Sequence, residues 1–235
     1  MTRTDILGVG FDPVTLDGAV DRALRLMERR GAYVCTPNPE IVMACRRDPE
    51  LMNAVNGADL VLPDGVGVVW AARRWKTPMP ERVSGVEFAE ALLSRMEGSV
   101  YVLGGKPGVA ELACRRIAED YPRVRVLGCC DGYITDELAL IAELAELRPD
   151  FLMVCLGASK QELWMAAHRE LPVGLMAGLG GTVDIFAGTV ERAPAKWRER
   201  GLEWLYRLLR QPWRFGRQLS LAAYAWTVIM RKNNV

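Results

Sequence analysis

The sequence predicts an α/β fold in which helices cover both faces of a parallel β-sheet. The first observation is that short, continuously apolar runs alternate with amphipathic runs over residues 99–181. The second is that glycines and small polar residues follow the apolar runs. The third is size, since 235 residues, 50% of them hydrophobic, suffice for one large domain or two small ones.

The first half of the chain is expected to begin with a strand over DILGVG, a helix over about residues 16–30 and a strand over AYVCT. Helical pieces over about 39–56 and a strand over ADLVLP follow. Ser84 and Glu87 have the spacing of a capping box, which predicts the start of a helix over about 85–97.

The second half alternates more regularly. Strands are expected over SVYVLGG, VRVLGCC, FLMVCLG and VGLMAGLGG, and helices near Pro107, over about 136–147 and over SKQELWMAAHRE. Strands and helices in this order are typical of βαβ units, so the sheet should be Rossmann-like. We expect one body over residues 1–193, built from two closely packed lobes of roughly 1–97 and 98–193.

Residues 194–235 are expected to form a helical, basic appendage. Residues 192–235 hold ten Lys or Arg against two acidic side chains, a balance of +8, whereas the rest of the chain is at −7. This asymmetry suggests that the C-terminal end meets an anionic partner. The last apolar run, Leu219 to Met230, has 12 residues and is too short to span a bilayer.

The apolar side chains of the appendage fall on two helical faces. One face is Leu202, Leu205, Leu208 and Leu209, and the other is Leu219, Ala222, Ala223, Trp226, Ile229 and Met230. Basic helices that carry Trp and Tyr are typical of a membrane interface, and packing on the body is the other interpretation. We expect contact with an anionic membrane surface and, because the total charge is only +1, no nucleic-acid partner.

Composition excludes several kinds of site. The beginning MTRTDILGVGFD turns polar at once, so no signal peptide is expected and the body should be cytoplasmic. The six cysteines form no CxxC pair and are expected to be reduced and buried. A single histidine, His168, rules out a multi-histidine metal site, and no D-x-D sequence occurs. We therefore expect neither a metal nor a cofactor.

Polar residues after strands are the candidate site residues, because ligands of α/β sheets bind beyond the carboxyl ends of the strands. Thr36 and Asn38 follow AYVCT between prolines that restrict their backbone, and Asp64 follows ADLVLP. By spacing alone, all three are equally well explained as turn formers or helix caps. In the other interpretation, Asp64 is a general base.

Three loops with glycines offer room for an anion or a nucleotide. Gly104 and Gly105 join a strand to a helix without matching G-x-G-x-x-G or a Walker A loop. Gln161 lies in the first turn of the next such helix, where a capping box over SKQE accounts for Glu162 but not for Gln161. Asp184 follows GLGGTV and either binds a ribose or base or caps a turn.

Eight blocks, in order along the chain, resemble the WecG/TagA/CpsF family of glycosyltransferases. They are TPNPE, ADLVLPDGVGVV, ERVSG, YVLGGKPGVAE, GYI, LGASKQELW, GLGGTVDIFAGTVERAP and GLEWLYRLLRQPWRFGRQ. The blocks run from residue 36 to 218 and cover nearly the whole chain. Many members have a proline where this chain has Ala158 or Ser159, and CCDGYI is less typical. Both departures lie on the expected donor side.

The resemblance implies an inverting, metal-independent transferase. Members move N-acetylmannosamine, or its uronic acid, from UDP to undecaprenyl-diphosphate-linked N-acetylglucosamine in cell-surface polysaccharide or teichoic acid synthesis. The implied partners are a UDP-sugar donor, the lipid-linked acceptor and the anionic inner face of the plasma membrane, where the protein would be peripheral. The alternative is transfer of glucose or another hexose from UDP to a lipid-linked exopolysaccharide intermediate.

The resemblance also implies roles for individual residues. Asp64 matches the catalytic base, and Thr36 and Asn38 match residues of the same pocket. The matching substrate-binding residues are Arg82 beside the acceptor or diphosphate, Tyr133, Gln161 and Asp184 on the nucleotide side, and Arg207, Arg214 and Arg217 over the diphosphate.

Overall fold

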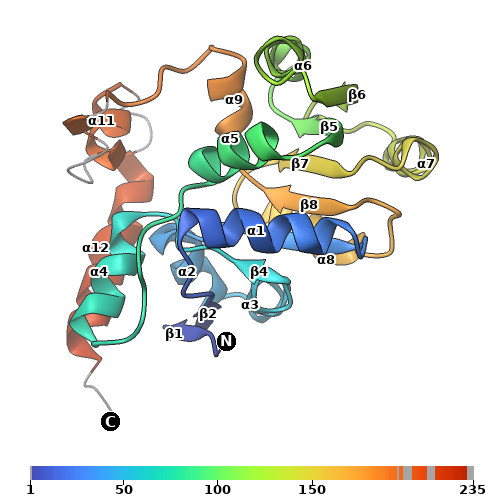
Figure 1. Ribbon diagram of the computed structural model, residues 1–235. Helices are drawn as coiled ribbons and strands as arrows, with labels where there is room; N and C mark the ends of the chain where they lie inside the picture. Colours follow the sequence, from blue (N-terminus) through green and yellow to red (C-terminus); the bar gives the residue numbers. More distant parts are fainter. Residues whose placement is uncertain (1, 195, 198–202, 211–214, 232–235) are drawn as a thin grey trace.

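The structure is a computed structural model that describes residues 2–194, 196–197, 203–210 and 215–231 (Figure 1). Within these residues a six-stranded sheet has the order β4-β3-β8-β7-β5-β6, and every neighbouring pair is parallel. Its strands are β3 (Ala32–Cys35), β4 (Leu60–Val61), β5 (Gly98–Gly104), β6 (Val124–Cys130), β7 (Phe151–Cys155) and β8 (Leu175–Gly178). The predicted α/β fold with a parallel sheet is confirmed.

The helices lie near the expected positions, with two additions. The expected helices are α1 (Leu16–Met27), α2 (Pro39–Cys45), α3 (Pro49–Asn56), α5 (Gly85–Arg95), α6 (Val109–Asp120), α7 (Glu137–Leu147) and α8 (Lys160–Ala167). The sequence prediction missed α4 (Val66–Arg74) and α9 (Thr182–Phe186). Ser84 begins α5 as predicted, because its side chain accepts a hydrogen bond from the Glu87 amide.

Two apolar clusters, one on each face of the sheet, form the core. Helices α1, α5, α6 and α9 pack on one face, and α2, α3, α7 and α8 pack on the other. Side chains of one strand alternate between the two clusters, so Tyr33 belongs to one and Val34 to the other. Strands from both halves of the chain share this sheet, whereas the division of the body into two lobes remains a prediction.

The expected single strand over DILGVG is wrong. The chain instead forms a hairpin of β1 (Thr4–Ile6) and β2 (Val9–Phe11), which is an antiparallel sheet of its own. Leu7 and Gly8 have φ angles of 58° and 96°, the positive values that a two-residue primed turn requires. The buried positions change phase at this turn, from Thr4 and Ile6 to Val9 and Phe11. The apolar residues continue without a polar break, which concealed the reversal of the chain.

The chain leaves the carboxyl ends of the neighbouring strands β5 and β7 in opposite directions. After β5 the chain crosses through α6 to β6, toward one end of the sheet, whereas after β7 it crosses through α8 to β8, toward the other end. Loops that leave neighbouring strands in opposite directions open a crevice between them, which is the usual ligand position in such sheets. The loops that begin at Gly105 and Leu156 border this crevice.

Two helices, α11 (Glu203–Arg210) and α12 (Phe215–Met230), belong to the C-terminal region (Figure 1). Helix α12 packs on α2 and α4 through Tyr224 and Val228, which are buried. The Tyr224 hydroxyl donates to the Gly67 carbonyl at 3.2 Å. The described members of the face predicted on α12 point outward instead, and among them Trp226 is 64% exposed. No helix in the described ranges is both long and apolar enough to cross a bilayer.

Candidate active site

Thr36 stands where β3 ends and ties three elements together. Its hydroxyl donates to the carbonyl of Gly178, the last residue of β8, at 2.8 Å. A Cβ placed on Gly85, the first residue of α5, would lie 3.4 Å from the Thr36 Oγ1. Thr36 is therefore a buried residue at the meeting point of β3, β8 and α5.

Asn38 and Asp64 are brought together by the neighbouring ends of β3 and β4. The Asn38 Oδ1 accepts from the Ile41 amide at 3.1 Å and so caps α2, as its structural interpretation expected. A Cβ placed on Gly65 would lie 3.7 Å from the Asn38 Cβ, which places Asn38 against the turn that carries Asp64. Gly65 is the N-cap of α4, and the Asp64 amide donates to the Leu62 carbonyl at 3.0 Å, so Asp64 lies in the turn before the helix and not at its N-cap.

Arg82 lies beside this group, in a network of charged side chains. The Val83 amide donates to the Pro63 carbonyl at 3.1 Å, which holds the segment before α5 against the strand end that precedes Asp64. Arg82 pairs with Glu87 at 3.0 Å. Arg192 pairs with Glu87 and with Glu90, both at 2.8 Å. Arg82 is therefore oriented by a carboxylate that also anchors the chain just before the C-terminal region.

Gly104 and Gly105 bring bare backbone to the crevice between β5 and β7. A Cβ on Gly104 would lie only 2.3 Å from the Cys155 carbonyl oxygen, and its φ of 129° is unfavourable for other residues. The Gly105 amide donates to the same carbonyl at 3.3 Å, and its carbonyl accepts from Gly132 at 2.8 Å. The Gly105 amide is thus already engaged, and the site here is a closely packed backbone junction.

Gln161 and Glu162 are buried next to the loop after β8, and Gln161 bonds to that loop. Gln161 is 2% exposed, and its Oε1 accepts from the Gly180 amide at 2.9 Å while its Nε2 donates to Glu162 at 2.9 Å. Glu162 is fully buried, and its second carboxylate oxygen has no hydrogen-bond partner. Burial raises the pKa of Glu162, and the hydrogen bond from Gln161 opposes that rise. Gln161 orders the glycine loop and does not face the surface.

The loop before α8 has an unusual backbone. Ser159 precedes α8 with a φ of 68°, and its side chain makes no capping hydrogen bond, so the serine half of the expected capping box over SKQE is wrong. The other half is present, because the Ser159 backbone hydrogen-bonds to the Glu162 carboxylate. A proline cannot take this angle, because its ring holds φ at about −65°. If a relative has its proline at position 159, its loop must therefore differ from this one.

Asp184 and Tyr133, the other two residues predicted on the nucleotide side, follow β8 and β6. Burial raises the pKa of the Cys155 thiol to about 12, and the Asp184 carboxylate contributes to that rise, so Asp184 lies near the end of β7. Three hydrogen bonds, from the Thr189 amide, the Thr189 hydroxyl and the Val190 amide, end on the Asp184 carbonyl rather than on its side chain. Tyr133 is 66% exposed on the loop after β6.

The three appendage arginines cannot be placed. Arg214 lies outside the described residues. Arg207 and Arg217 belong to α11 and α12, but their side chains are outside the described part of the structure. Their proximity to Asp64 or to the glycine loops therefore remains a prediction.

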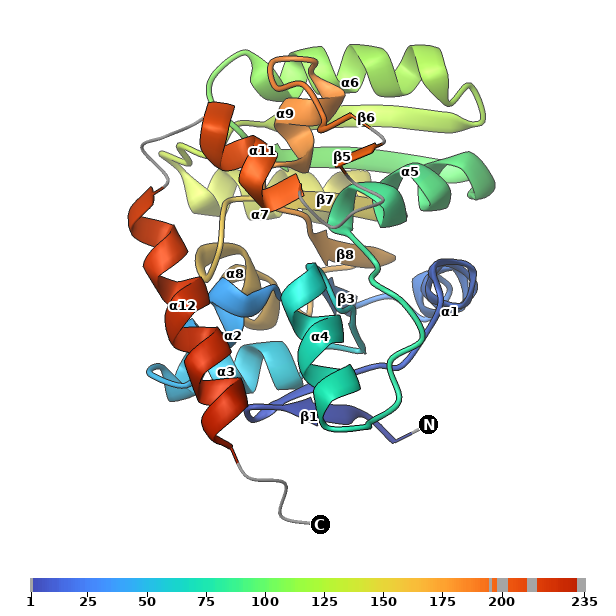
Figure 2. The ribbon, with the colours of Figure 1, turned by 90° about the vertical axis from the view of Figure 1, so that its left-hand side faces the viewer.

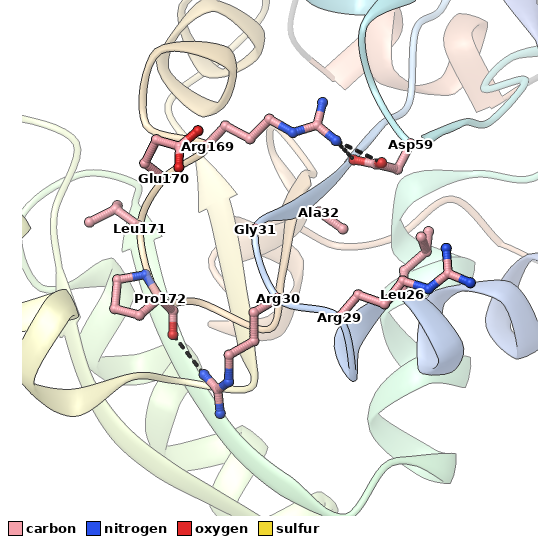
Figure 3. Close-up of a pocket in the computed structure, with 10 residues that line it drawn as sticks. All are labelled: Leu26, Arg29, Arg30, Gly31, Ala32, Asp59, Arg169, Glu170, Leu171 and Pro172. Carbon is pink, nitrogen blue, oxygen red and sulfur yellow. Dashed lines mark hydrogen bonds and ion pairs between the residues drawn. The ribbon is translucent and has the colours of Figure 1, made fainter.

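A pocket of about 490 Å³ opens at the opposite edge of the sheet (Figure 3). Two of its arginines are committed to the protein: Arg169 pairs with Asp59 at 2.8 Å, and Arg30 donates to the Pro172 carbonyl at 2.6 Å. The pocket begins where β3 begins, at Ala32, so it lies at the amino edge. Because ligands of parallel sheets bind at the carboxyl edge, we place the candidate site with Asp64.

The sequence interpretation missed two supporting residues. Glu162 was assigned to a helix cap, and nothing in its local sequence indicates full burial, because charged residues are rarely buried. Arg192 was counted only as part of the basic C-terminal region, although it pairs with α5. The six cysteines are all free, but the prediction that all are buried is wrong: Cys35, Cys45 and Cys155 are buried, whereas Cys114, Cys129 and Cys130 are only partly buried. Among the described residues, no three His, Cys, Asp or Glu side chains gather as metal ligands.

Comparisons with known proteins match the chain over nearly its whole length. A Bacillus subtilis (strain 168) protein named N-acetylglucosaminyldiphosphoundecaprenol N-acetyl-beta-D-mannosaminyltransferase is 34% identical over 211 residues, which cover 88% of this chain and 82% of that protein. A Staphylococcus aureus (strain MRSA252) protein of the same name is 31% identical over 241 aligned positions, with 99% and 94% covered. The sequence profile described as the Glycosyl transferase WecG/TagA/CpsF family matches residues 4–234. The chain therefore belongs to the WecG/TagA/CpsF family of glycosyl transferases.

Proposed function

We propose that the protein transfers N-acetylmannosamine, or its uronic acid, from UDP to the 4-hydroxyl of N-acetylglucosamine on undecaprenyl diphosphate. The observation that carries the proposal is that Asp64 lies beside Asn38 at the carboxyl ends of the strands. From there the bond between Thr36 and Gly178 leads along the same edge of the sheet to the glycine loops at the β5–β7 crevice. The names of the two relatives support this acceptor and this sugar. The product would enter a cell-surface polysaccharide or teichoic acid.

In the proposed reaction, Asp64 removes the proton from the acceptor hydroxyl as its oxygen attacks the anomeric carbon. The bond from that carbon to the UDP oxygen breaks on the opposite face, so the configuration inverts and UDP leaves with the electron pair. General-base catalysis of this kind contributes roughly 10²- to 10⁴-fold in rate. Thr36 ties the end of β3 to β8, and Asn38 caps α2 next to the turn that carries Asp64.

The charge that develops on the diphosphate is stabilised by arginines in this mechanism. Arg82 is the described candidate, since Glu87 orients it beside the Pro63–Asp64 strand end. Arg207, Arg214 and Arg217 are the proposed partners from the C-terminal region. Guanidinium groups bind phosphate oxygens in a bidentate way, so they can take the place of a metal ion. The activity should therefore persist in EDTA.

The donor is proposed to lie along the β5–β7 crevice. Gly104 and Gly105 permit close approach of the chain, and Tyr133 and Asp184 border the same region. In this arrangement Gln161 acts through the loop it supports, because its amide oxygen holds Gly180. We further propose that the protein works as a peripheral protein at the inner face of the plasma membrane, with the outward side chains of α12 in the interface.

A donor screen tests the proposal. The protein would be incubated with UDP-N-acetylmannosamine, its uronic acid, UDP-glucose and UDP-N-acetylglucosamine, together with a short-chain prenyl-diphosphate-linked N-acetylglucosamine. We expect UDP release only with the mannosamine donors, and a product linked at the 4-hydroxyl. Preferred use of UDP-glucose would replace the donor assignment with the alternative hexose.

A further inference from the structure

Helix α4 leaves one stripe of side chains uncovered, and this stripe begins directly beyond Asp64 and Gly65. Val66 and Trp70 are each 40% exposed, and Arg73 and Arg74 are exposed in the last turn. These positions are spaced i, i+4, i+7 and i+8, so they lie on one face of the helix. The opposite face, with Val68, Val69, Ala71 and Ala72, is buried.

The stripe combines the exposed Trp70 ring with the positive charges of two exposed arginines, Arg73 and Arg74. Neither Arg73 nor Arg74 makes an ion pair or side-chain hydrogen bond with a residue that the structure describes. Nearby Arg231, by contrast, pairs with Asp5 at 3.0 Å and lies 4.9 Å from the centre of the Trp75 ring. Two arginines at a helix C-terminus can be explained by the helix dipole, but this does not explain the exposed Trp70.

The helix that carries the stripe packs against α12. Helices α4 and α12 stand side by side on one side of the molecule (Figure 2), joined by the bond from Tyr224 to Gly67 and by a 3.3 Å bond from the Trp75 indole to the Val228 carbonyl. On α12, Trp226, Ile229 and Met230 are exposed. Two neighbouring helices thus both expose tryptophan and aliphatic side chains, and α4 adds basic charge.

We infer that the α4 stripe, defined as Val66, Trp70, Arg73 and Arg74, is a membrane-contacting surface of the body itself, and that its partner is an anionic bilayer leaflet. Tryptophan favours the depth of the lipid headgroups, where its ring is partly apolar and its N–H stays polar. Arginines bind the lipid phosphates. The surface begins two residues beyond Asp64, so bound membrane lies beside the proposed base.

The membrane contact is inferred from the exposure and charge of α4 alone. Its role in catalysis, however, rests on the proposed function. If the acceptor is a prenyl diphosphate in the leaflet, the α4 stripe holds Asp64 at the height where that diphosphate emerges from the bilayer. Loss of the stripe should then weaken the use of membrane-embedded acceptor and leave the use of a soluble acceptor intact.

Vesicle binding tests the contact. The full-length variant Arg73→Gln/Arg74→Gln would be compared with the unchanged protein by sedimentation with vesicles of phosphatidylglycerol and phosphatidylcholine in equal parts, and with pure phosphatidylcholine. Each arginine near an anionic leaflet contributes roughly fivefold in partitioning, so we expect about a 25-fold loss on the anionic vesicles only. Trp70→Phe, compared with the unchanged protein, should reduce quenching by brominated lipid.

The matched control removes the same charge from α6 and β6, at the end of the sheet opposite to β4. Arg115 and Arg125 are exposed on α6 and β6, so Arg115→Gln/Arg125→Gln should bind vesicles like the unchanged protein. Equal loss in both double variants would overturn the assignment, since only total charge would then matter. Unchanged binding of Arg73→Gln/Arg74→Gln would overturn it as well.

Activity measurements separate this inference from the proposed function. With a soluble short-chain acceptor, the kcat of Arg73→Gln/Arg74→Gln should be unchanged, whereas its KM for undecaprenyl acceptor in vesicles should rise about 10-fold or more. Weaker binding with an unchanged KM would overturn the catalytic meaning of the contact. If the unchanged protein uses none of the tested UDP-sugars, the proposed function fails, while the vesicle result still decides the membrane contact.

Discussion

The two ends of the sheet's carboxyl edge are built from different groups. At the β3–β4 end, the strands deliver side chains: Thr36 is bonded to Gly178, Asn38 caps α2, and Asp64 stands before the N-cap of α4. At the β5–β7 end, the strand ends carry glycine, and Gly104 packs its backbone directly against Cys155.

This difference matches the chemistry proposed for each end. A proton can be removed only by a titratable side chain held at a fixed position, which the capped and hydrogen-bonded β3–β4 end provides. A nucleotide diphosphate needs backbone without a bulky Cβ, which the β5–β7 end offers at Gly108, where nothing lies within 4 Å of an added Cβ. Substitutions at the first end should therefore change kcat, and those at the second should change stability or donor affinity.

Asp64→Asn should have the largest effect on catalysis. The amide cannot accept the acceptor proton, so we expect kcat to fall roughly 10²- to 10⁴-fold while the Kd for UDP stays within about twofold. Asp184→Asn is the matched substitution at the other end and should raise the KM for the donor more than it lowers kcat. Steady-state kinetics with isothermal titration of UDP would check both; full turnover by Asp64→Asn excludes Asp64 as the base.

Gly104→Ala should destabilise the fold most among the glycine variants. Its Cβ would lie 2.3 Å from the Cys155 oxygen, so β5 and β7 must move apart, at a cost of about 3 kcal/mol or more in the free energy of unfolding. Gly108→Ala is the control, because its φ of 82° is strained but no atom lies within 4 Å of the added Cβ, and about 1 kcal/mol is expected. Urea unfolding measures both, and equal losses contradict the close-packing argument.

Thr36→Val should cost about 1–3 kcal/mol in the free energy of unfolding, because the Gly178 carbonyl loses its buried donor. Thr36→Ser keeps the hydroxyl and should retain most of that stability. If the bond also aligns the two ends of the edge, Thr36→Val lowers kcat and Thr36→Ser restores it. Thermal unfolding alongside kinetics would reveal a purely structural role as a stability loss without a kcat change.

Glu162→Gln should have the smallest effect, and the effect should depend on pH. Burial raises the pKa of Glu162 in the folded protein, so its favourable contribution is complete below the unfolded pKa of about 4.3 and is lost as pH rises through the folded pKa. The glutamine has no charge to bury. The Tm of Glu162→Gln relative to the unchanged protein should therefore increase between pH 4 and 8. A difference that is constant across this range contradicts a raised pKa.

Much of the fold was predictable, because hydrophobic periodicity reports which residues face a core. The strands β5 to β8 and the helices between them lie where the apolar runs indicated. Prediction failed at the hairpin, because no polar residue separates β1 from β2. The only signals of the turn are a change in the phase of the buried positions and the positive φ angles of Leu7 and Gly8. Helix α4 was missed because VGVVW reads equally well as the continuation of a strand.

The candidate site likewise contains residues that the sequence predicted and residues that it did not. Residue types at strand ends, together with the order of the eight blocks, pointed to Asp64, Thr36 and Asn38, because strand ends are where parallel sheets bind ligands. The buried partners of these groups had no local signal. Glu162 and Arg192 acquire their roles only from residues that are distant in the sequence or from complete exclusion of water.

The sequence by itself determined the α/β class, the helix starts at residues such as Ser84, and the family, since these depend on short-range periodicity, capping chemistry and local motifs. Only the tertiary structure decided that α12 buries Tyr224 and Val228 and turns Trp226 outward, and that α4, which packs against α12, exposes Trp70. The physical reason is that both faces of these helices carry apolar side chains. Which face is buried depends on the shape of the surface it meets, and a single chain's periodicity does not contain that shape.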